Sequence, residues 1–455
     1  MKRHQQSMLE GPLFSSIISY TIPIILTSIL QLLFNAADLV IVGRFRGSES
    51  VAAVSATTAL VNLIVNLFVG LSVGAGVTVA HGLGSREAGV VHRAVHTAIP
   101  MALVAGFIVT IVGVLFSETF LKLMGTPADV LPLSSLYLKI YFGGIIFTMV
   151  YNFCAAILRA AGDTKSPLLF LALSGILNVG MNVLFVYYFH MNVEGVAIAT
   201  VVSQAVSAVL VMIALMRRTD ACKLDLKKIR FYKPQLVKMI QVGLPAGLQS
   251  SMFSISNVII QSSINSFDNV LLMSGNGAAA SIEGFIYVTL NSFHQTAVNY
   301  IGQNAGAGKF NRVKKTYVIC LLSSIVITVL LSTTVYLLGP ELLGIYITDS
   351  TEAIKYGMIR FTYVNLTYFL CAMMDVSTGA LRGLGASLTP MLISILGVCG
   401  IRIGWIYTVF RIPAYHSTES LYISYPISWA VTFGFLLYFF IRIYKKHTSF
   451  QQHLK

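Results

Sequence analysis

Residues 156–167 read AILRAAGDTKSP and residues 379–390 read GALRGLGASLTP, with arginine, glycine and proline at matching places. Two further pairs of segments recur at nearly the same separation: ISYTIP (18–23) with IQVGLP (240–245), and LGSREAGVVHRA (83–94) with AGAGKFNRVKKT (305–316). Three separate matches at nearly one offset indicate that the chain consists of two repeated halves.

Long apolar segments lie on both sides of these repeated motifs. A helix needs roughly 20 residues to cross about 30 Å of hydrocarbon, because it rises 1.5 Å per residue. Continuous apolar runs of this length fit helices and not the alternating pattern of a membrane barrel. The sequence predicts twelve spans: 15–43, 51–81, 92–116, 133–158, 166–189, 193–217, 236–264, 278–302, 313–338, 356–381, 388–411 and 420–444.

The composition of the 455 residues also indicates a lipid environment. Hydrophobic residues make up 56% of the chain and charged residues only 11%, whereas a soluble protein has about 25% charged residues. The mean hydropathy is +0.78. So few charged side chains cannot cover a water-soluble globule, which argues against soluble enzymes, coiled coils and disordered proteins. The predicted fold class is an all-α integral membrane protein.

Basic residues predict the orientation of the spans. If the N-terminus lies inside, twelve spans place the C-terminus inside as well, and the inner segments then hold 23 of the 31 Lys and Arg residues. This excess is the positive-inside signal, and it accounts for the net charge of +14 without binding to nucleic acid. The longest polar stretch lies at the midpoint. The sequence therefore predicts a first lobe (1–216), a cytoplasmic linker (217–238) and a second lobe (239–455).

The number of spans in each half constrains the symmetry. Six is even, so both halves begin on the same side of the membrane, and a pseudo-two-fold axis along the membrane normal relates the two six-helix bundles. Many secondary transporters have this arrangement, bind substrate between their halves and alternate access by rocking. The five cysteines form no CxxC pair, and no HExxH motif occurs, so the sequence indicates neither a structural metal site nor a metalloprotease.

The set and order of the motifs resemble the MATE family, the multidrug and toxic compound extrusion antiporters. The matching motifs are FNAADLVIVG (34–43), HGLGSREAGVVHRA (81–94), LRAAGDTKSP (158–167), GVAIATVVSQ (195–204), GQNAGAGKFNRVKK (302–315) and GALRGLGASLTP (379–390). The resemblance covers nearly the whole chain. It implies two six-helix bundles around a central cavity and export of small organic, often cationic, compounds, driven by inward flow of H⁺ or Na⁺.

Further expectations follow from this resemblance. The chain is expected to be a monomer in the cell's inner (cytoplasmic) membrane, in contact with lipid, with no enzymatic activity and no cofactor besides the coupling ion. NorM-like members of the family carry a glutamate where this chain has Phe253 and an aspartate where it has Cys371. The sequence therefore resembles the DinF-like branch more closely. An alternative function is a flippase for a lipid-linked or amphipathic substrate, but that predicts more than twelve spans and a strongly cationic cavity, and the sequence indicates neither.

Three of the seventeen acidic residues, Asp38, Glu283 and Asp375, lie well inside predicted spans, and a carboxylate in hydrocarbon is costly enough to indicate a functional site. Asp38 lies at about the same depth as Asn182 and Thr200, roughly 8–11 Å below the outer surface at 1.5 Å per residue. Asn178 lies one turn deeper on the same helix face as Asn182. These four residues are predicted to form the cation- or proton-coupling site, with Na⁺ possible beside Asp38. DinF-like members use matching residues but often have an aspartate at the position of Asn182, so the single carboxylate favours H⁺.

The second half offers a less defined candidate cavity. Asp375 is predicted to lie at a similar depth to His294 and Gln295, and His294 could relay a proton. Glu283 and Arg402 are predicted to face the same leaflet, where an ion pair between them is plausible. The depths of Glu283 and Asp375 differ by roughly 20 Å, so these two carboxylates are not expected to act as a pair.

Overall fold

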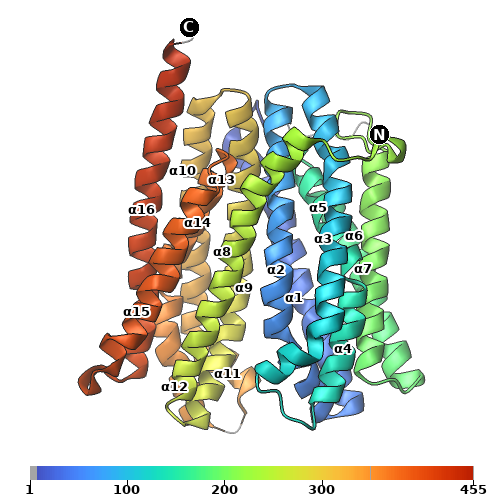
Figure 1. Cartoon of the computed structure of the whole chain (residues 1–455). Helices are drawn as coiled ribbons and strands as arrows, with labels where there is room; N and C mark the ends of the chain where they lie inside the picture. Colours follow the sequence, from blue (N-terminus) through green and yellow to red (C-terminus); the bar gives the residue numbers. More distant parts are fainter. Residues whose placement is uncertain (1–7, 349, 454–455) are drawn as a thin grey trace. The chain divides into compact units, whose positions relative to one another are not determined.

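The computed structural model describes residues 8–348 and 350–453, and every regular element in these two ranges is a helix (Figure 1). The chain forms two compact units. The first unit contains Ile22–Ser251, and the second contains Met8–Thr21 together with Met252–Lys455. Two helices therefore begin in one unit and end in the other, namely α1 (Leu13–Arg46) and α8 (Lys233–Asn265).

The remaining helices of the first unit follow in chain order: α2 (Ser48–Gly84), α3 (Ala88–Leu123), α4 (Leu131–Gly143), α5 (Ile145–Ala160), α6 (Lys165–Asn182), the π-helical turn η1 (Val183–Tyr188), α7 (Val193–Met216) and the short η2 (Leu226–Lys228). Those of the second unit are α9 (Val270–Gly306), α10 (Phe310–Leu337), α11 (Gly339–Tyr346), α12 (Thr351–Arg360), the π-helical turn η3 (Phe361–Asn365), α13 (Tyr368–Gly383), α14 (Leu388–Ser394), the π-helical turn η4 (Ile395–Gly400), α15 (Ile401–Tyr407), the short η5 (Val409–Arg411) and η6 (Pro413–Tyr415), and α16 (Thr418–His453).

These helices account for the predicted spans. Within the described residues, eight helices or continuous helical segments are long and apolar enough to cross a membrane, and two bent helix pairs bring the number to ten. The other two predicted spans correspond to α8 and α9, which have 33 and 37 residues and are not among these ten. The all-helical membrane fold is therefore confirmed.

The two bent spans occupy equivalent places in the two repeats. The axes of α4 and α5 differ by 47° at a break that contains Gly144, and α12–η3 and α13 differ by 43° at a break that contains Thr367, the matching position of the second repeat. The packing partners also correspond: α5 packs on α2 and α3, and α13 packs on α9 and α10. The sequence repeat thus has a structural counterpart inside each unit.

The repeated glycine of the opening motif ends a helix in both units. Gly162 follows α5 with φ +87°, and Gly385 follows α13 with φ +85°. Side chains with a Cβ rarely adopt this left-handed conformation, so glycine is favoured directly after a helix. The next residue then bonds back into the helix, with Asp163 N donating to Leu158 O at 2.9 Å. The second unit repeats this bond between Ala386 N and Leu381 O at 3.0 Å.

Part of the linker is bound to α3. The backbone N–H of Asp225 donates to His96 Nε2 at 3.0 Å, and the backbone N–H of Tyr232 donates to Thr97 Oγ1 at 3.2 Å. Asp225 also accepts from Lys227 N, and this bond holds the pKa of its exposed carboxyl below the ordinary value. The linker therefore has a defined path over the start of α3.

Small residues let α8 pack directly on α2 within the first unit. A Cβ on Gly74 would lie 2.0 Å from Met239 O, and one on Gly247 would lie 2.0 Å from Leu67 O. The glycines are spaced four apart on both helices (Gly70 and Gly74, Gly243 and Gly247), the GxxxG pattern of close membrane-helix packing. In the second unit, the repeat places Thr296 and Thr21 at the positions equivalent to Gly74 and Gly243. Their hydroxyls form a hydrogen bond of 2.8 Å.

We expect Gly74→Ala to lower the thermal unfolding midpoint of the purified protein by several degrees, because the added methyl group must push two backbones apart. Overpacking of this kind typically costs about 1–3 kcal/mol. The matched control is Gly284→Ala in α9, where a Cβ meets nothing within 4 Å and alanine improves helix propensity. Equal midpoints for the two variants would contradict the close α2–α8 contact.

Candidate functional site

The four residues predicted around Asp38 come together within the first unit. Asp38 lies on α1, Asn178 and Asn182 on α6, and Thr200 on α7. Asn182 Nδ2 donates to Asp38 Oδ1 at 2.5 Å and to Asn178 Oδ1 at 3.2 Å. Thr200 Oγ1 lies 3.4 Å from both Asp38 Oδ2 and Asn178 Nδ2. We refer to these four residues as the Asp38 cluster.

Two features of the helices around the Asp38 cluster favour its geometry: a glycine at a close helix contact and a π-helical turn. A Cβ on Gly175 would lie 1.8 Å from the Phe34 ring, so glycine at this position lets α1 approach α6 one turn before Asn178. The α-helix changes to the π-helical turn η1 directly after Asn182, and such turns are frequent at functional sites. Asp38 is 8% exposed and Asn182 is fully buried, so the carboxylate relies on protein groups rather than bulk water.

The structure adds one residue that the sequence analysis missed. Tyr137 of α4 is buried and lies within electrostatic range of Asp38. The depth argument could have found it, because Tyr137 lies near the start of the predicted span 133–158 and therefore near the depth of Asp38. A tyrosine among many aromatic residues, however, gives no separate signal in the sequence.

Glu283 of α9 pairs with Arg360 of α12 and not with Arg402. Arg360 Nη2 and Nε lie 2.7 Å and 3.1 Å from Glu283 Oε2. Arg360 Nη1 also donates to Asn276 Oδ1 at 2.8 Å, which accepts from Tyr422 Oη at 3.1 Å. The predicted pair with Arg402 is therefore wrong. Arg360 lies just inside the predicted span 356–381, so counting basic residues within spans would have found it.

Arg402 of α15 is held by other groups. Its Nε donates to Ser428 Oγ at 3.0 Å, and its guanidinium carbon lies 4.0 Å from the centre of the Tyr425 ring and 5.4 Å from that of Trp429. The side chain is 4% exposed. A cation over aromatic faces is stabilised by the ring quadrupoles, most strongly where water is excluded.

The structure brings Asp375, His294 and Gln295 near one another, and Asn291 belongs to the same group. Asn291 connects two of them, because it bonds to the Asp375 carboxylate and accepts from Gln295 Nε2 at 3.2 Å. His294 Nδ1 bonds to the Asp375 backbone oxygen at 2.8 Å, while its Nε2 lies 3.3 Å from Arg382 Nη1. Since arginine is always a donor, His294 accepts at Nε2 and is neutral with its proton on Nδ1. In this arrangement it holds two helices together, and a relay role stays a prediction.

The described residues contain no group of three or more His, Cys, Asp or Glu side chains that could hold a metal ion. Around Asp38 the available ligands are oxygens from one carboxylate, two amides and a hydroxyl, of the kind that suits a hard monovalent cation. Asn182 Oδ1 is buried there without a hydrogen-bond partner. The cluster could therefore accept a proton or a cation.

The sequence contains one match to the GxSxG motif of serine hydrolases and one HxxxH pair of histidines. Both lie inside helices. GLSVG (70–74) falls within α2, where Ser72 Oγ donates to Val69 O at 2.7 Å, so Ser72 is not placed on a strand-to-helix turn as a nucleophile requires. HRAVH (92–96) falls within α3, where His96 bonds to His92 O and to the linker. Neither match supports catalysis.

Removing one charge of the Glu283–Arg360 pair should destabilise the second unit strongly. Breaking a buried ion pair typically costs about 3–5 kcal/mol, because the remaining charge is left without compensation. We expect Glu283→Gln and Arg360→Gln each to lower the unfolding midpoint, and the double variant Glu283→Gln/Arg360→Gln to recover part of the loss. The control is Glu118→Gln, whose partner Lys122 is exposed. Additive losses in the double variant would contradict the pairing.

Comparisons with known proteins agree with this architecture. The MatE family model matches residues 23–184 and again residues 245–408, and the two matches begin at Pro23 and Pro245, the equivalent prolines of the repeat. A probable multidrug resistance protein of Bacillus subtilis (strain 168), YoeA, is 24% identical over 452 residues, which cover 97% of this chain and 96% of YoeA. The multidrug export protein MepA of Staphylococcus aureus (strain NCTC 8325 / PS 47) is 23% identical, covering 88% of this chain and 92% of MepA.

Solved structures share the fold over nearly the whole length. The outward-facing structure of a multidrug resistance MATE family transporter of the MOP superfamily superposes with a TM-score of 0.88 at 20% identity, covering 99% of this chain and 100% of that one. A structure of MATE in complex with MaL6 gives a TM-score of 0.89 at the same identity and coverage. Since the family model matches well over half of the residues, in two copies that follow the internal repeat, the chain belongs to the MatE family of membrane transporters.

Proposed function

We propose that this protein is a secondary active multidrug exporter that moves small organic, often cationic, compounds out of the cell in exchange for inward H⁺, with Asp38 as the proton-carrying group. The function of export follows the named relatives, which are multidrug export and resistance proteins. The coupling ion is our inference from the Asp38 cluster. The proposed location is the bacterial cell membrane, as a monomer with both termini in the cytoplasm.

The single observation that carries the choice of H⁺ is the count of charges around Asp38. One carboxylate is surrounded by two amides, a threonine and a tyrosine, and none of these four neighbours carries a charge. A second carboxylate would add the negative charge that strengthens cation binding, and Asn182 stands where DinF-like members often have one. A lone buried carboxylate is instead neutralised by a single proton.

The hydrogen bonds of the cluster leave room for that proton. Thr200 has one hydroxyl hydrogen and lies 2.9 Å from Val196 O, a better acceptor distance than the 3.4 Å to Asp38 Oδ2. When Thr200 donates to Val196, a proton on Asp38 Oδ2 can be donated to Thr200 Oγ1. Asp38 Oδ1 still accepts from Asn182 in this state. A proton on Asp38 thus has Thr200 as its nearest acceptor, and after deprotonation Thr200 would have to reorient to donate to Oδ2.

We also propose that the protein belongs to the DinF-like branch of the family. Phe253 and Cys371 replace the two acidic residues that NorM-like members carry in the second half. The acids that are present there have other partners, since Glu283 pairs with Arg360 and Asp375 bonds to Asn291. Coupling through the first unit is therefore favoured over coupling through the second.

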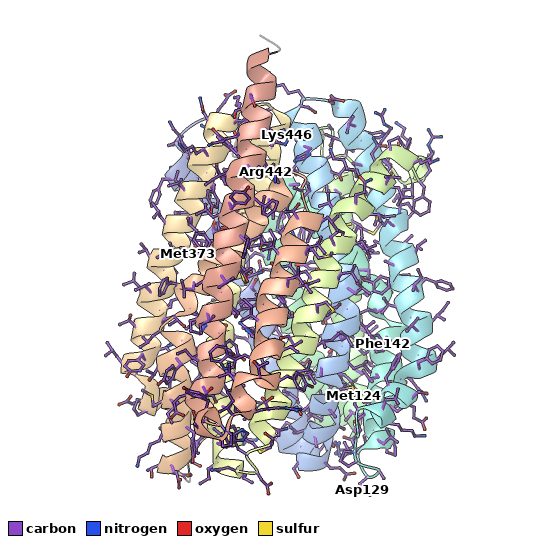
Figure 2. The ribbon with its side chains drawn as sticks, turned by 60° about the vertical axis from the view of Figure 1, so that its left-hand side comes forward. Met124, Asp129, Phe142, Met373, Arg442 and Lys446 are labelled. Carbon is purple, nitrogen blue, oxygen red and sulfur yellow. The ribbon has the colours of Figure 1, made fainter. Side chains whose placement is uncertain are left out.

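Asp38→Asn should abolish export driven by a pH gradient, because an amide cannot release a proton. The measurement is efflux of ethidium from loaded proteoliposomes after a pH jump, with protein-free liposomes as the baseline. Asp129→Asn, an exposed residue in the turn between α3 and α4 (Figure 2), should leave the rate unchanged. Gradient-driven efflux by Asp38→Asn at the wild-type rate would show that another group carries the proton.

A second experiment tests the role of Asn182 in ion choice. In the wild type we expect a pH gradient to drive efflux and a Na⁺ gradient at constant pH to have no effect. Asn182→Asp places a second carboxylate beside Asp38, and two adjacent carboxylates retain an additional cation, so Na⁺-driven efflux should appear. Asn265→Asp, at an exposed position at the end of α8, is the matched control. Efflux driven by Na⁺ in the wild type would contradict the assignment of H⁺.

A further inference from the structure

The interior of the second unit carries more buried positive than negative charge. Its described membrane helices contain three buried arginines and two buried carboxylates: Arg360, Arg382, Arg402, Glu283 and Asp375. Arg360 pairs with Glu283, and Arg382 is the charged neighbour of Asp375. His294 adds no charge, since its two ring nitrogens are satisfied in the neutral form. One cation, that of Arg402, is therefore left without a carboxylate.

The surroundings of Arg402 confirm this imbalance. Its electrostatic neighbours are two phenols and two thiols, those of Tyr425, Tyr368, Cys371 and Cys399. All four are neutral in their ordinary protonation states. An arginine in a membrane interior without a counter-charge is expensive, and such residues usually mark a substrate or ion path.

The Nη2 amino group of Arg402 is also unused. Nε donates to Ser428, but Nη2 is buried and has no hydrogen-bond partner. A buried donor without a partner costs about 1–3 kcal/mol, and more when the group is charged. Both the missing charge and the missing acceptor would be supplied by one anion placed at Nη2.

The local backbone holds Arg402 in this place. The π-helical turn η4 ends two residues before Arg402. Within η4, a Cβ on Gly397 would lie 2.1 Å from Thr432 Oγ1, so the glycine lets this segment press against α16. That approach brings Arg402 over Tyr425 and Trp429, the two aromatic residues of α16 that face the guanidinium.

We propose that Arg402 binds a single negative charge, either the carboxylate of an aromatic compound, with Tyr425 and Trp429 as the apolar wall, or a chloride ion. This proposal deepens the proposed function, since it adds anionic and zwitterionic aromatic compounds to the exported class. A monoanion fits because one positive charge and the Nη2 amino group are uncompensated. A dianion would leave a net negative charge in the same interior.

Intrinsic fluorescence reports directly on this position. The chain contains two tryptophans, and both are close to Arg402: Trp429 lies 5.4 Å away and Trp405 is three residues further along α15. We would titrate the purified protein with 4-nitrobenzoate, whose nitroaromatic ring quenches tryptophan, and with uncharged 4-nitrobenzamide as the matched probe. Quenching should be saturable for the benzoate and linear for the benzamide. Equal curves for the two probes would overturn the proposal.

Variants show whether binding of 4-nitrobenzoate depends on the charge of Arg402 or changes with any substitution of a charged residue. Arg402→Gln should weaken the apparent affinity for 4-nitrobenzoate at least tenfold, Arg402→Lys should weaken it less, and Arg442→Gln on the exposed part of α16 (Figure 2) should leave it unchanged. Unchanged affinity in Arg402→Gln would overturn the proposal. If that variant fails to fold, the comparison of the two probes in the wild type still tests whether the site binds a carboxylate.

The two sources of the anion are distinguished by competition. If chloride displaces 4-nitrobenzoate while sulfate at the same ionic strength does not, the site accepts a halide. If neither salt displaces it, the site requires a carboxylate. The titration uses no ion gradient, and Asp38→Asn should bind 4-nitrobenzoate like the wild type. A failure of proton coupling and a failure of anion binding are therefore observed separately.

Discussion

A polar group inside a membrane protein must find its partner within the protein, because hydrocarbon offers none. This constraint governs the buried charges described above, and Arg402 satisfies it only in part. Asp38 is surrounded by neutral groups on three other helices, Glu283 is matched by Arg360, and Arg402 lies over aromatic rings. The helices that carry these groups change to π-helical geometry beside Asn182, Arg360 and Arg402. The backbone thus departs from regular α-helix at the places where a charged or strongly polar side chain needs a particular direction.

The fold could be predicted from the sequence because the lengths of the apolar segments and the offset between the repeats are both read directly along the chain. Twelve spans, their order and the repeated motifs could all be inferred from the chain alone. The Asp38 cluster was also predictable, since residues from different spans at one depth have few alternatives. Depth does not specify which helices are neighbours. The sequence therefore suggests Arg402 as the partner of Glu283, whereas the structure shows Arg360. Which side chains face each other depends on how each helix is rotated about its axis. Packing sets this rotation, and neither hydropathy nor composition specifies it.

The two repeats keep one packing scheme and carry different chemistry. The close contact of Gly74 with α8 in the first unit becomes a hydrogen bond between Thr21 and Thr296 in the second. The buried charges diverge further, since Asp38 is surrounded by neutral groups in one unit while three arginines exceed two carboxylates in the other. A duplicated bundle supplies two scaffolds of the same shape, and each can hold a charge of opposite sign. Under the two proposals made above, the first half binds a cation and the second an anion.

The sharing of α1 and α8 between the units affects how the chain is made. Residues through Ser251 are needed to complete the first unit, so its last contacts form only after the ribosome has passed the linker and begun the second repeat. The second unit, in turn, includes Met8–Thr21, which are synthesised first and wait for partners such as Thr296. The first bundle therefore cannot close during synthesis of its own repeat, whereas all parts of the second exist once the second repeat is made. The first helix remains incompletely packed until residues such as Thr296 have been synthesised.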